Sequence, residues 1–251
     1  MEVGLTQWIV ELAVEHDAIP YGPHHVCPYL PDRTARERAF ISDAMDGLTY
    51  HRLMEHGYRR SGTCYYKTAC TDCHECVPLR VPVSTFRPSR SQRRVWRRNA
   101  DLRVELAPPT PSRERHALFQ KYLDRQHDGS MSGDYDDFCR FLYESQVDTL
   151  EATYWLGRDL VGAGILDVCS KSVSSVYFYF DPDHGRRSLG VFSSLWEIDY
   201  ARRRDIPYYY LGYYIDGARS MNYKARFGPH ERRLPSGEWR RFDGGHGETS
   251  T

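Results

Sequence analysis

The pattern of apolar and polar positions separates an irregular N-terminal part from a more regular remainder. Residues 16–36, HDAIPYGPHHVCPYLPDRTAR, contain four prolines and show no helical or strand period, which predicts loops. The pattern over Leu48–His56 predicts one short helix that ends at Gly57. After it, runs such as LRVPVSTF alternate briefly, so residues 58–86 are expected to form short strands and loops.

The second half carries clearer periods. Ser112 is expected to cap a helix that continues to about Gln126, and Asp134 a second helix that continues to about Glu144. The segments LEATYWLG, LVGAGILDV and SSVYFYFDP predict three strands, and their short turns favour antiparallel hairpins. LGVFSSLWEIDYARRR then predicts a helix, PYYYLGYYI a further strand, and ARSMNYKARF a segment that begins as a helix. This order of elements indicates an α+β fold.

The chain is long enough for one large domain or two small ones, with 251 residues. The segment AlaProProThrPro at residues 107–111 is the best linker candidate. We therefore expect a smaller Cys- and Arg-rich domain at residues 1–107 and a second domain at residues 108–251.

Composition excludes a membrane-spanning protein. The mean hydropathy is −0.66 and 27% of the residues are charged, and no apolar stretch approaches the ~18 residues that a spanning helix needs. The first residues, MEVGLTQWIVELAVEH, hold acids and no basic run, so we expect no secretory signal. This predicts a cytoplasmic protein that binds no membrane, in which cysteines are reduced thiols or metal ligands.

Arginine dominates the positive charge. The 34 basic residues balance 34 acidic ones, and 30 of the basic residues are Arg; phosphate and carboxylate binding or a GC-rich genome would both produce this bias. Seven of these arginines fall within residues 87–103. On a helix, one face would hold Arg90, Arg93, Arg94 and Arg97. Such a face predicts contact with nucleic-acid phosphates, and the alternative is an ordinary solvated helix.

The seven cysteines include one closely spaced group. Cys70, Cys73 and Cys76 form a C-x2-C-x2-C run, and Cys27 is a candidate fourth ligand. Closely spaced thiolates hold zinc or iron–sulfur clusters. The spacing alone leaves an iron–sulfur cluster, zinc and metal-free thiols open.

Three segments together resemble a known family. They are HGYRRSGTCYYKTACTDCHECVPLRVPVSTFRPSRSQRR, SSVYFYFDPDHGRRSLGVFSSLWEI and YYYLGYYIDGARSMNYKARFGPHE. This pattern resembles the arginyl-tRNA–protein transferase family, and its bacterial, leucine-transferring branch in particular. The resemblance implies transfer of leucine from leucyl-tRNA to the α-amine of proteins that begin with Asp or Glu, which creates a degradation signal (an N-degron). It also implies an acetyltransferase-like (GNAT) second domain, and it permits an iron–sulfur cluster on the N-terminal cysteines.

The chemistry implied by this resemblance sets simple demands. An aminoacyl ester is already activated, and the nucleophile is an amine whose pKa is about 7.7–8.0. The site must align the two, neutralise the amine and stabilise an oxyanion, and no cofactor is required. Asp181, at the end of the SSVYFYFDP strand, is the candidate base, and Tyr179 is a candidate proton shuttle. The alternative for Asp181 is a local Asx turn.

An acidic acceptor residue requires cations. Arg59 and Arg60 lie in the first family segment, and Lys224 and Arg226 lie in the third. We expect some of these four side chains to bind the acceptor carboxylate, and the alternative is that they are solvated surface charges.

The donor requires a phosphate-binding surface. The basic helix predicted above suits the acceptor stem of a tRNA. The stretch HGRRSLGVFSS, just before the helix that begins at Leu189, adds Arg187, Ser188 and Gly190 as candidate donor contacts.

Four alternatives stay open at this stage. The donor is arginyl-tRNA in related enzymes. An acetyl-CoA-dependent acetyltransferase is a rival, although HGRRSLGVFSS departs from the R/Q-x-x-G-x-G/A loop of that superfamily, so no coenzyme A is expected. A non-catalytic, metal-dependent nucleic-acid-binding module and an inactive family member are the other two.

Overall fold

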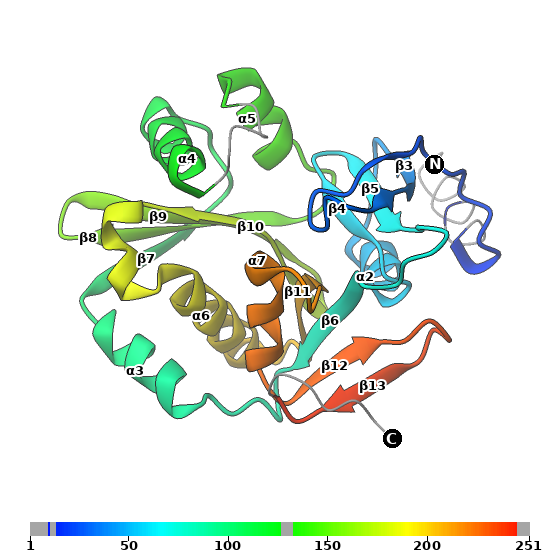
Figure 1. The fold of residues 1–251 in the computed structure, drawn as a ribbon. Helices are drawn as coiled ribbons and strands as arrows, with labels where there is room; N and C mark the ends of the chain where they lie inside the picture. Colours follow the sequence, from blue (N-terminus) through cyan, green and yellow to red (C-terminus); the bar gives the residue numbers. More distant parts are fainter. Residues whose placement is uncertain (1–9, 11–13, 127–132, 245–251) are drawn as a thin grey trace.

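One large mixed sheet organises the molecule (Figure 1). The computed structural model describes residue 10 and residues 14–126 and 133–244, so most of the N-terminal segment that bears on secretion lies outside the described residues. The strand order is β13 (Trp239–Phe242), β12 (His230–Arg233), β6 (Val77–Pro82), β11 (Tyr208–Tyr214), β10 (Ser172–Phe180), β9 (Asp159–Val168), β8 (Thr149–Leu156) and β7 (Leu102–Ala107). All neighbours are antiparallel except β10 and β11, which are parallel.

Helices cover both faces of this sheet. On one face, α6 (Leu189–Arg203) buries Phe192, Leu195 and Ile198 in the main apolar cluster. On the other face, α4 (Arg113–Gln126) and α5 (Tyr135–Leu142) pack around buried aromatic residues. Tyrosine fills much of this core, since the side chains of Tyr154 and Tyr209 are fully buried. The central strands therefore lie between two apolar layers.

The first part of the chain forms a smaller layer beside the large sheet (Figure 1). Its three strands are β3 (Glu37–Ile41), β5 (Cys64–Thr68) and β4 (Arg59–Ser61), preceded by the two-residue strands β1 (His25–Val26) and β2 (Thr34–Ala35). The helix α2 (Gly47–Glu55) begins where the carboxylate of Asp46 accepts hydrogen bonds from the backbone of Leu48 and Thr49. Because the apolar cluster of this layer includes Tyr210 of β11, the two layers share buried surface.

Most of the predicted elements are present. The helices α2, α4, α5 and α6 and the antiparallel hairpins of β8, β9 and β10 confirm the sequence pattern. The arginine run forms α3 (Arg90–Arg98), which starts at a capping box of Ser89 and Gln92. The remaining short elements are η1 (Pro182–Arg187), α7 (Arg219–Asn222) and η2 (Tyr223–Arg226).

Two features of the large sheet differ from the sequence expectation. β6 and β7 come from the part of the chain before residue 108 but pair with strands from the second half. The hairpin of β12 and β13 extends the sheet beyond β6. Both depend on pairing between distant segments, which a local period cannot indicate. None of the helices in the described part of the chain combines the length and the apolar character needed to cross a bilayer.

Candidate active site

The single parallel strand pair separates soon after it forms. β10 and β11 pair only through Ser172, Val173 and Ser174 on one side and residues 208–210 on the other. Beyond that point the register of β10 with β9 shifts between Ser175 and Tyr177, and the register of β11 with β6 shifts between residues 210 and 212. Both shifts are irregularities that bend a strand. The divergence opens a wedge in the middle of the sheet, with backbone groups that the ladder no longer pairs.

Two cationic side chains occupy this wedge. Arg59 of β4 donates one hydrogen bond from Nη1 to Ser174 Oγ at 2.9 Å and another from Nη2 to the carbonyl oxygen of Ser175. Lys224 of η2 donates from Nζ to the carbonyl oxygen of Tyr213 at 2.9 Å. Both residues are only 8% exposed. The wedge therefore brings together two of the four cations predicted for the acceptor carboxylate.

Gly212 makes room for this pair. Its φ of +89° is a conformation that side chains rarely adopt. A Cβ at this position would lie 3.4 Å from Nζ of Lys224 and 3.6 Å from Nε and Nη2 of Arg59. The two cations therefore meet over the same point of β11.

The charges of this pair are not balanced by an acid. Within the described ranges, neither Arg59 nor Lys224 forms an ion pair with a carboxylate. Burial, and after it the neighbouring Arg59, lowers the pKa of Lys224 to about 7, and the thiol of Cys76 opposes this shift. Burying like charges without a counter-ion is unfavourable. Two buried cations without a partner acid therefore favour a negative charge beside them.

A pocket of about 180 Å³ adjoins the wedge. Tyr213 belongs to both, because its side chain lines the pocket while its carbonyl oxygen binds Lys224. The hydroxyl of Tyr213 also donates to the carbonyl oxygen of Gly57 at 2.8 Å and so joins β11 to the N-terminal layer. At the rim, Arg33 donates a hydrogen bond to Cys73 Sγ at 3.2 Å. The walls are mixed apolar and aromatic, with Tyr29, Leu30, Tyr66, Thr68 and Ala35 among the lining residues.

The four cysteines singled out by their spacing line this same pocket; they are Cys27, Cys70, Cys73 and Cys76. Across the described part of the chain, however, no three His, Cys, Asp or Glu side chains are placed to hold a metal ion. Burial also raises the pKa of Cys76 to about 12, which favours its thiol form. As arranged, these side chains do not fit a bound metal ion, and no step proposed below uses a metal or cluster.

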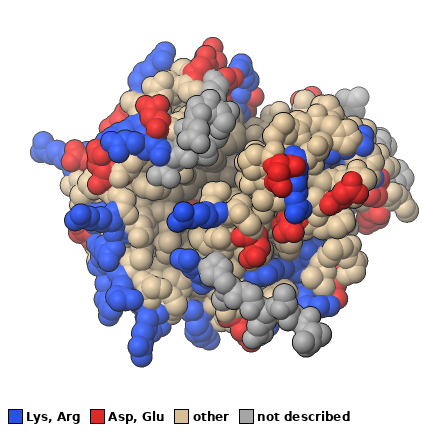
Figure 2. All heavy atoms as spheres, viewed as in Figure 1, with Lys and Arg blue, Asp and Glu red and all other residues tan. Residues whose placement is uncertain are grey.

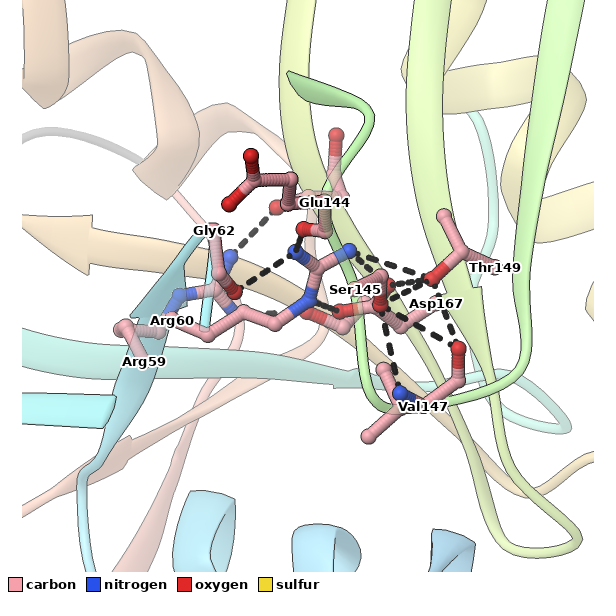
Figure 3. A network of polar contacts seen from close by, with 10 residues as sticks. Arg59, Arg60, Gly62, Glu144, Ser145, Val147, Thr149 and Asp167 are labelled. Atoms are coloured by element: carbon pink, nitrogen blue, oxygen red, sulfur yellow. Dashed lines mark hydrogen bonds and ion pairs between the residues drawn. The ribbon is translucent and has the colours of Figure 1, made fainter. Parts of the chain in front are cut away.

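Arg60 is placed differently from its neighbour Arg59 (Figure 3). Its Nε and Nη2 donate to the two carboxylate oxygens of Asp167 at 2.7 and 2.5 Å, and both side chains are fully buried. Nη2 also donates to Thr149 Oγ1 at 3.2 Å. Arg60 therefore links β4 to β8 and β9, and it is unavailable to an acceptor because its guanidinium is fully buried against a carboxylate of the chain itself. Arg226 is exposed, and its carbonyl oxygen accepts a hydrogen bond from Gln92 of α3.

The two residues predicted to act in catalysis lie away from the wedge. The carboxylate of Asp181 accepts a hydrogen bond from the backbone of Asp183 and pairs with Lys121, which is the Asx-turn alternative. Asp181 is six positions beyond Ser175, or about 20 Å along an extended strand. Tyr179 is buried in the aromatic cluster under α4 and α5. Local sequence marked the end of a strand but not the position of the wedge, and the wedge includes neither residue.

The predicted donor contacts gather at another edge. In α3, the side chains of Arg90, Arg93, Arg94 and Arg97 are all exposed, and Lys and Arg side chains line the edge where α3 lies (Figures 1 and 2). An open surface depression of about 540 Å³ lies nearby, lined by Arg98, Arg186 and Arg187.

The start of α6 adjoins this depression. Arg187 pairs with Asp101 at 2.8 Å. Ser188 precedes α6 in a left-handed conformation without a side-chain cap, and Gly190 is in its first turn. This edge therefore combines exposed arginines with an uncapped helix start, a combination that suits phosphates.

The sequence analysis missed two residues near the wedge. Gly212 interrupts an aromatic strand pattern, PYYYLGYYI, and this interrupting glycine was the available signal. Glu197 of α6 was also missed. It is buried between Ser193 Oγ and the hydroxyl of Tyr209, both at 2.8 Å, and burial raises its pKa to about 7. An acid on the buried face of an amphipathic helix was the signal for this residue.

The chain matches two models of one protein family, described as the N terminus of arginine-tRNA-protein transferase over residues 25–94 and its C terminus over residues 114–234. These matches define the class as transferases that use an aminoacyl-tRNA. Curated relatives make the assignment narrower. The chain is 42% identical to aspartate/glutamate leucyltransferase of Marinobacter nauticus, over 87% of this chain and 93% of the relative.

The protein of the same name from Hahella chejuensis is 39% identical, over 82% and 90% of the two chains. This chain therefore belongs to the arginine-tRNA-protein transferase family, within the group whose curated members are named aspartate/glutamate leucyltransferase. Membership confirms the resemblance seen in the three sequence segments and identifies the chain as an aminoacyltransferase.

Among solved structures, the chain resembles L-PGS from Bacillus licheniformis with a TM-score of 0.45 and 12% identity, over 67% of this chain and 49% of that one. A likeness at this level carries no argument about function.

Proposed function

We propose that this chain transfers leucine from leucyl-tRNA to the α-amine of proteins whose first residue is Asp or Glu. The product then begins with leucine, a destabilising residue that marks the protein for degradation. The observation that carries the proposal is the buried pair of Arg59 and Lys224, which lacks a carboxylate partner in the described structure. The side chain of an N-terminal Asp or Glu supplies that carboxylate.

The acceptor enters through the cysteine-lined pocket in this proposal. Its carboxylate binds in the wedge, where Arg59 offers a planar guanidinium and Lys224 an amine. The α-amine lies on the carbon next to the side chain, so it is held within a few ångströms of the same cations. Acceptor recognition then involves residues 1–107 together with Lys224 of the second part.

The donor lies along the opposite, basic edge. The exposed arginines of α3 bind the acceptor stem, and Arg187, Ser188 and Gly190 bind phosphates near the 3′ end. We also assign the large-sheet part an acetyltransferase-like (GNAT) architecture, supported by an antiparallel sheet with one parallel pair that diverges. Since the donor is a tRNA, the cytoplasm is the proposed compartment.

A transfer assay tests this function. Peptides that begin with Asp, Glu, Lys or Ala are mixed with labelled leucyl-tRNA or labelled arginyl-tRNA and the purified chain. We expect leucine on the Asp and Glu peptides alone. Arginine on those peptides would show that the donor is arginyl-tRNA. The absence of label on every peptide would overturn the proposal.

A further inference from the structure

The amine of Lys224 has an unusual set of neighbours for a buried lysine. Nζ donates to one oxygen, the carbonyl of Tyr213 at 2.9 Å, and lies 3.5 Å from Met221 Sδ. A charged ammonium carries three N–H donors. One carbonyl oxygen and a thioether leave that charge poorly solvated. The geometry thus favours a neutral amine with a free lone pair as long as no anion is bound.

The surroundings of Lys224 disfavour its protonated form, with one exception. Arg59 of β4 faces it across Gly212 and disfavours the proton, whereas negative charge on Cys76, just before β6, would favour it. β11 contributes the carbonyl oxygen of Tyr213, and α7 contributes the side chain of Met221. Burial and Arg59 prevail, and they lower the pKa of Lys224 to about 7. A carboxylate placed between the two cations would reverse this balance.

We propose that Lys224 accepts the proton of the acceptor's α-ammonium group, and that the acceptor's own acidic side chain triggers this transfer. The inference rests on the proposed function, because it needs the carboxylate of Asp or Glu in the wedge. The anion makes the protonated state of Lys224 favourable, and the proton source is the α-ammonium group of the same residue, which two carbons separate from the carboxylate in Asp and three in Glu. Lys224 thereby becomes a catalytic residue, since it contacts the reacting residue.

The proton count of the reaction is complete. The α-ammonium passes one proton to the lone pair of Lys224 Nζ, and the resulting amine attacks the ester carbonyl carbon. The new C–N bond forms and the bond between that carbon and the ribose oxygen breaks. A second proton moves from the nitrogen to the departing ribose oxygen, which leaves as a hydroxyl, and the amide keeps the third. Lys224 later returns its proton to solvent.

In this mechanism one carboxylate determines both which acceptor binds and whether its α-amine loses a proton. Asn has the shape of Asp but no charge. A peptide that begins with Asn therefore forms no ion pair with the two cations and does not trigger the proton transfer. We therefore expect Asn and Gln peptides to lose turnover as well as affinity. Recognition by charge alone would affect affinity and leave kcat at saturation unchanged.

A binding experiment on the wild-type chain provides the first test. The ligand is a succinyl-peptide, which is an Asp peptide without its α-amine and cannot react. Calorimetry at pH 8 in two buffers of different ionisation enthalpy counts the protons taken up on binding. We expect uptake of about 0.5 to 1 proton, because a group with a pKa near 7 is mostly neutral at pH 8 until the anion binds. Binding without proton uptake would overturn the inference.

Kinetics of K224R provide the second test, with K171R as a matched control at an exposed lysine. Arg keeps the positive charge but accepts no proton near neutral pH. For Asp peptides at pH 7 we expect kcat to fall about 10-fold in K224R, because only about a tenth of an amine with a pKa of about 7.7–8.0 is neutral there without a base, while KM stays within about threefold. The deficit should shrink towards pH 8.5, where the acceptor amine is neutral by itself.

Two outcomes separate the inference from the proposed function. A K224R variant with wild-type kcat and pH profile overturns the inference and leaves leucine transfer intact. Wild-type protein that does not modify Asp or Glu peptides overturns the function itself. A thermal melt verifies that K224R is folded, and the calorimetric test holds regardless because it uses no variant.

Discussion

Arg59 and Arg60 are consecutive residues of one strand, yet they have opposite electrostatic surroundings. Side chains of adjacent strand residues point to opposite sides, so Arg60 meets Asp167 while Arg59 enters the wedge beside Lys224. Both guanidinium groups are buried. Arg60 has its counter-ion within the chain, whereas Arg59 has none among the described residues. A buried cation that the fold itself neutralises is structural, whereas one without a partner acid is available for a substrate.

The largest expected effect comes from breaking the neutralised pair. R60A leaves the carboxylate of Asp167 buried without its partner, and such losses cost about 3–5 kcal/mol of unfolding free energy. The double variant R60M/D167N, which removes both charges, should recover most of the loss. Urea unfolding measures both, with R158A as a control at an exposed arginine. A wild-type midpoint in R60A would contradict the structural role of the pair.

The next effect concerns Lys224 and the pH dependence of the unfolding free energy. A lysine whose folded pKa is near 7, below its unfolded value near 10.4, binds fewer protons in the folded state across that range. Stability should therefore rise between about pH 7 and pH 10 by the contribution of Lys224, on the order of a few kcal/mol. K224M should be more stable than wild type at pH 7, and this advantage should disappear near pH 10. An advantage that does not change with pH would show that Lys224 is not the titrating group.

The variant R59Q tests whether Arg59 acts in acceptor binding, in contrast to the structural role of Arg60. Because no acid in the described part of the chain pairs with Arg59, its loss should change the unfolding free energy by much less than R60A does. The cost should appear in recognition, where a hydrogen-bonded charge contributes about 1.5–3 kcal/mol. We expect KM for Asp peptides to rise about 10- to 100-fold with folding preserved. A large loss of stability with unchanged KM would make Arg59 the structural residue of the two.

G212A is expected to have a smaller effect. A side chain at φ of +89° costs about 1–2 kcal/mol. The new methyl group would also contact both cations, so KM for the acceptor should rise a few-fold. G157A, at another glycine with positive φ but with no atom within 4 Å of the added Cβ, controls for the backbone cost. Equal changes of KM in both variants would show that Gly212 has no role in acceptor binding.

The smallest effect on stability belongs to the exposed arginines of α3. Replacing Arg93, Arg94 and Arg97 by Gln should change the unfolding free energy by less than about 0.5 kcal/mol. The same variant should bind leucyl-tRNA more weakly and reduce the salt dependence of binding by up to about 0.9 per lost phosphate contact. An unchanged salt slope would place the tRNA elsewhere.

Several properties of the site could be predicted from the sequence. The family segments identified the reaction class, and the C-x2-C-x2-C run identified cysteines that do line one pocket. Arg59 and Lys224, 165 positions apart, were both named as candidates. What no local pattern contained was which of the adjacent arginines would find an acid, since Asp167 lies more than 100 positions away from either.

The two catalytic candidates illustrate the same limit. Asp181 followed a strand in a family segment, and the strand does end there. The divergence of β10 and β11, however, occurs six residues earlier, where a register shift follows Ser175. Register is set by pairing with neighbouring strands and not by the period of one strand.

The sequence by itself determined the helices, the antiparallel hairpins, the exposed arginine face of α3 and membership in the family. Those properties depend on spacing along the chain, where caps, turns and apolar periods act over a few residues. Only the tertiary structure decided that β6 and β7 enter the large sheet, that Arg60 is neutralised and that Arg59 meets Lys224 over Gly212. The reason is physical: the charge state and availability of a buried group depend on what surrounds it in three dimensions, and those neighbours come from distant parts of the chain.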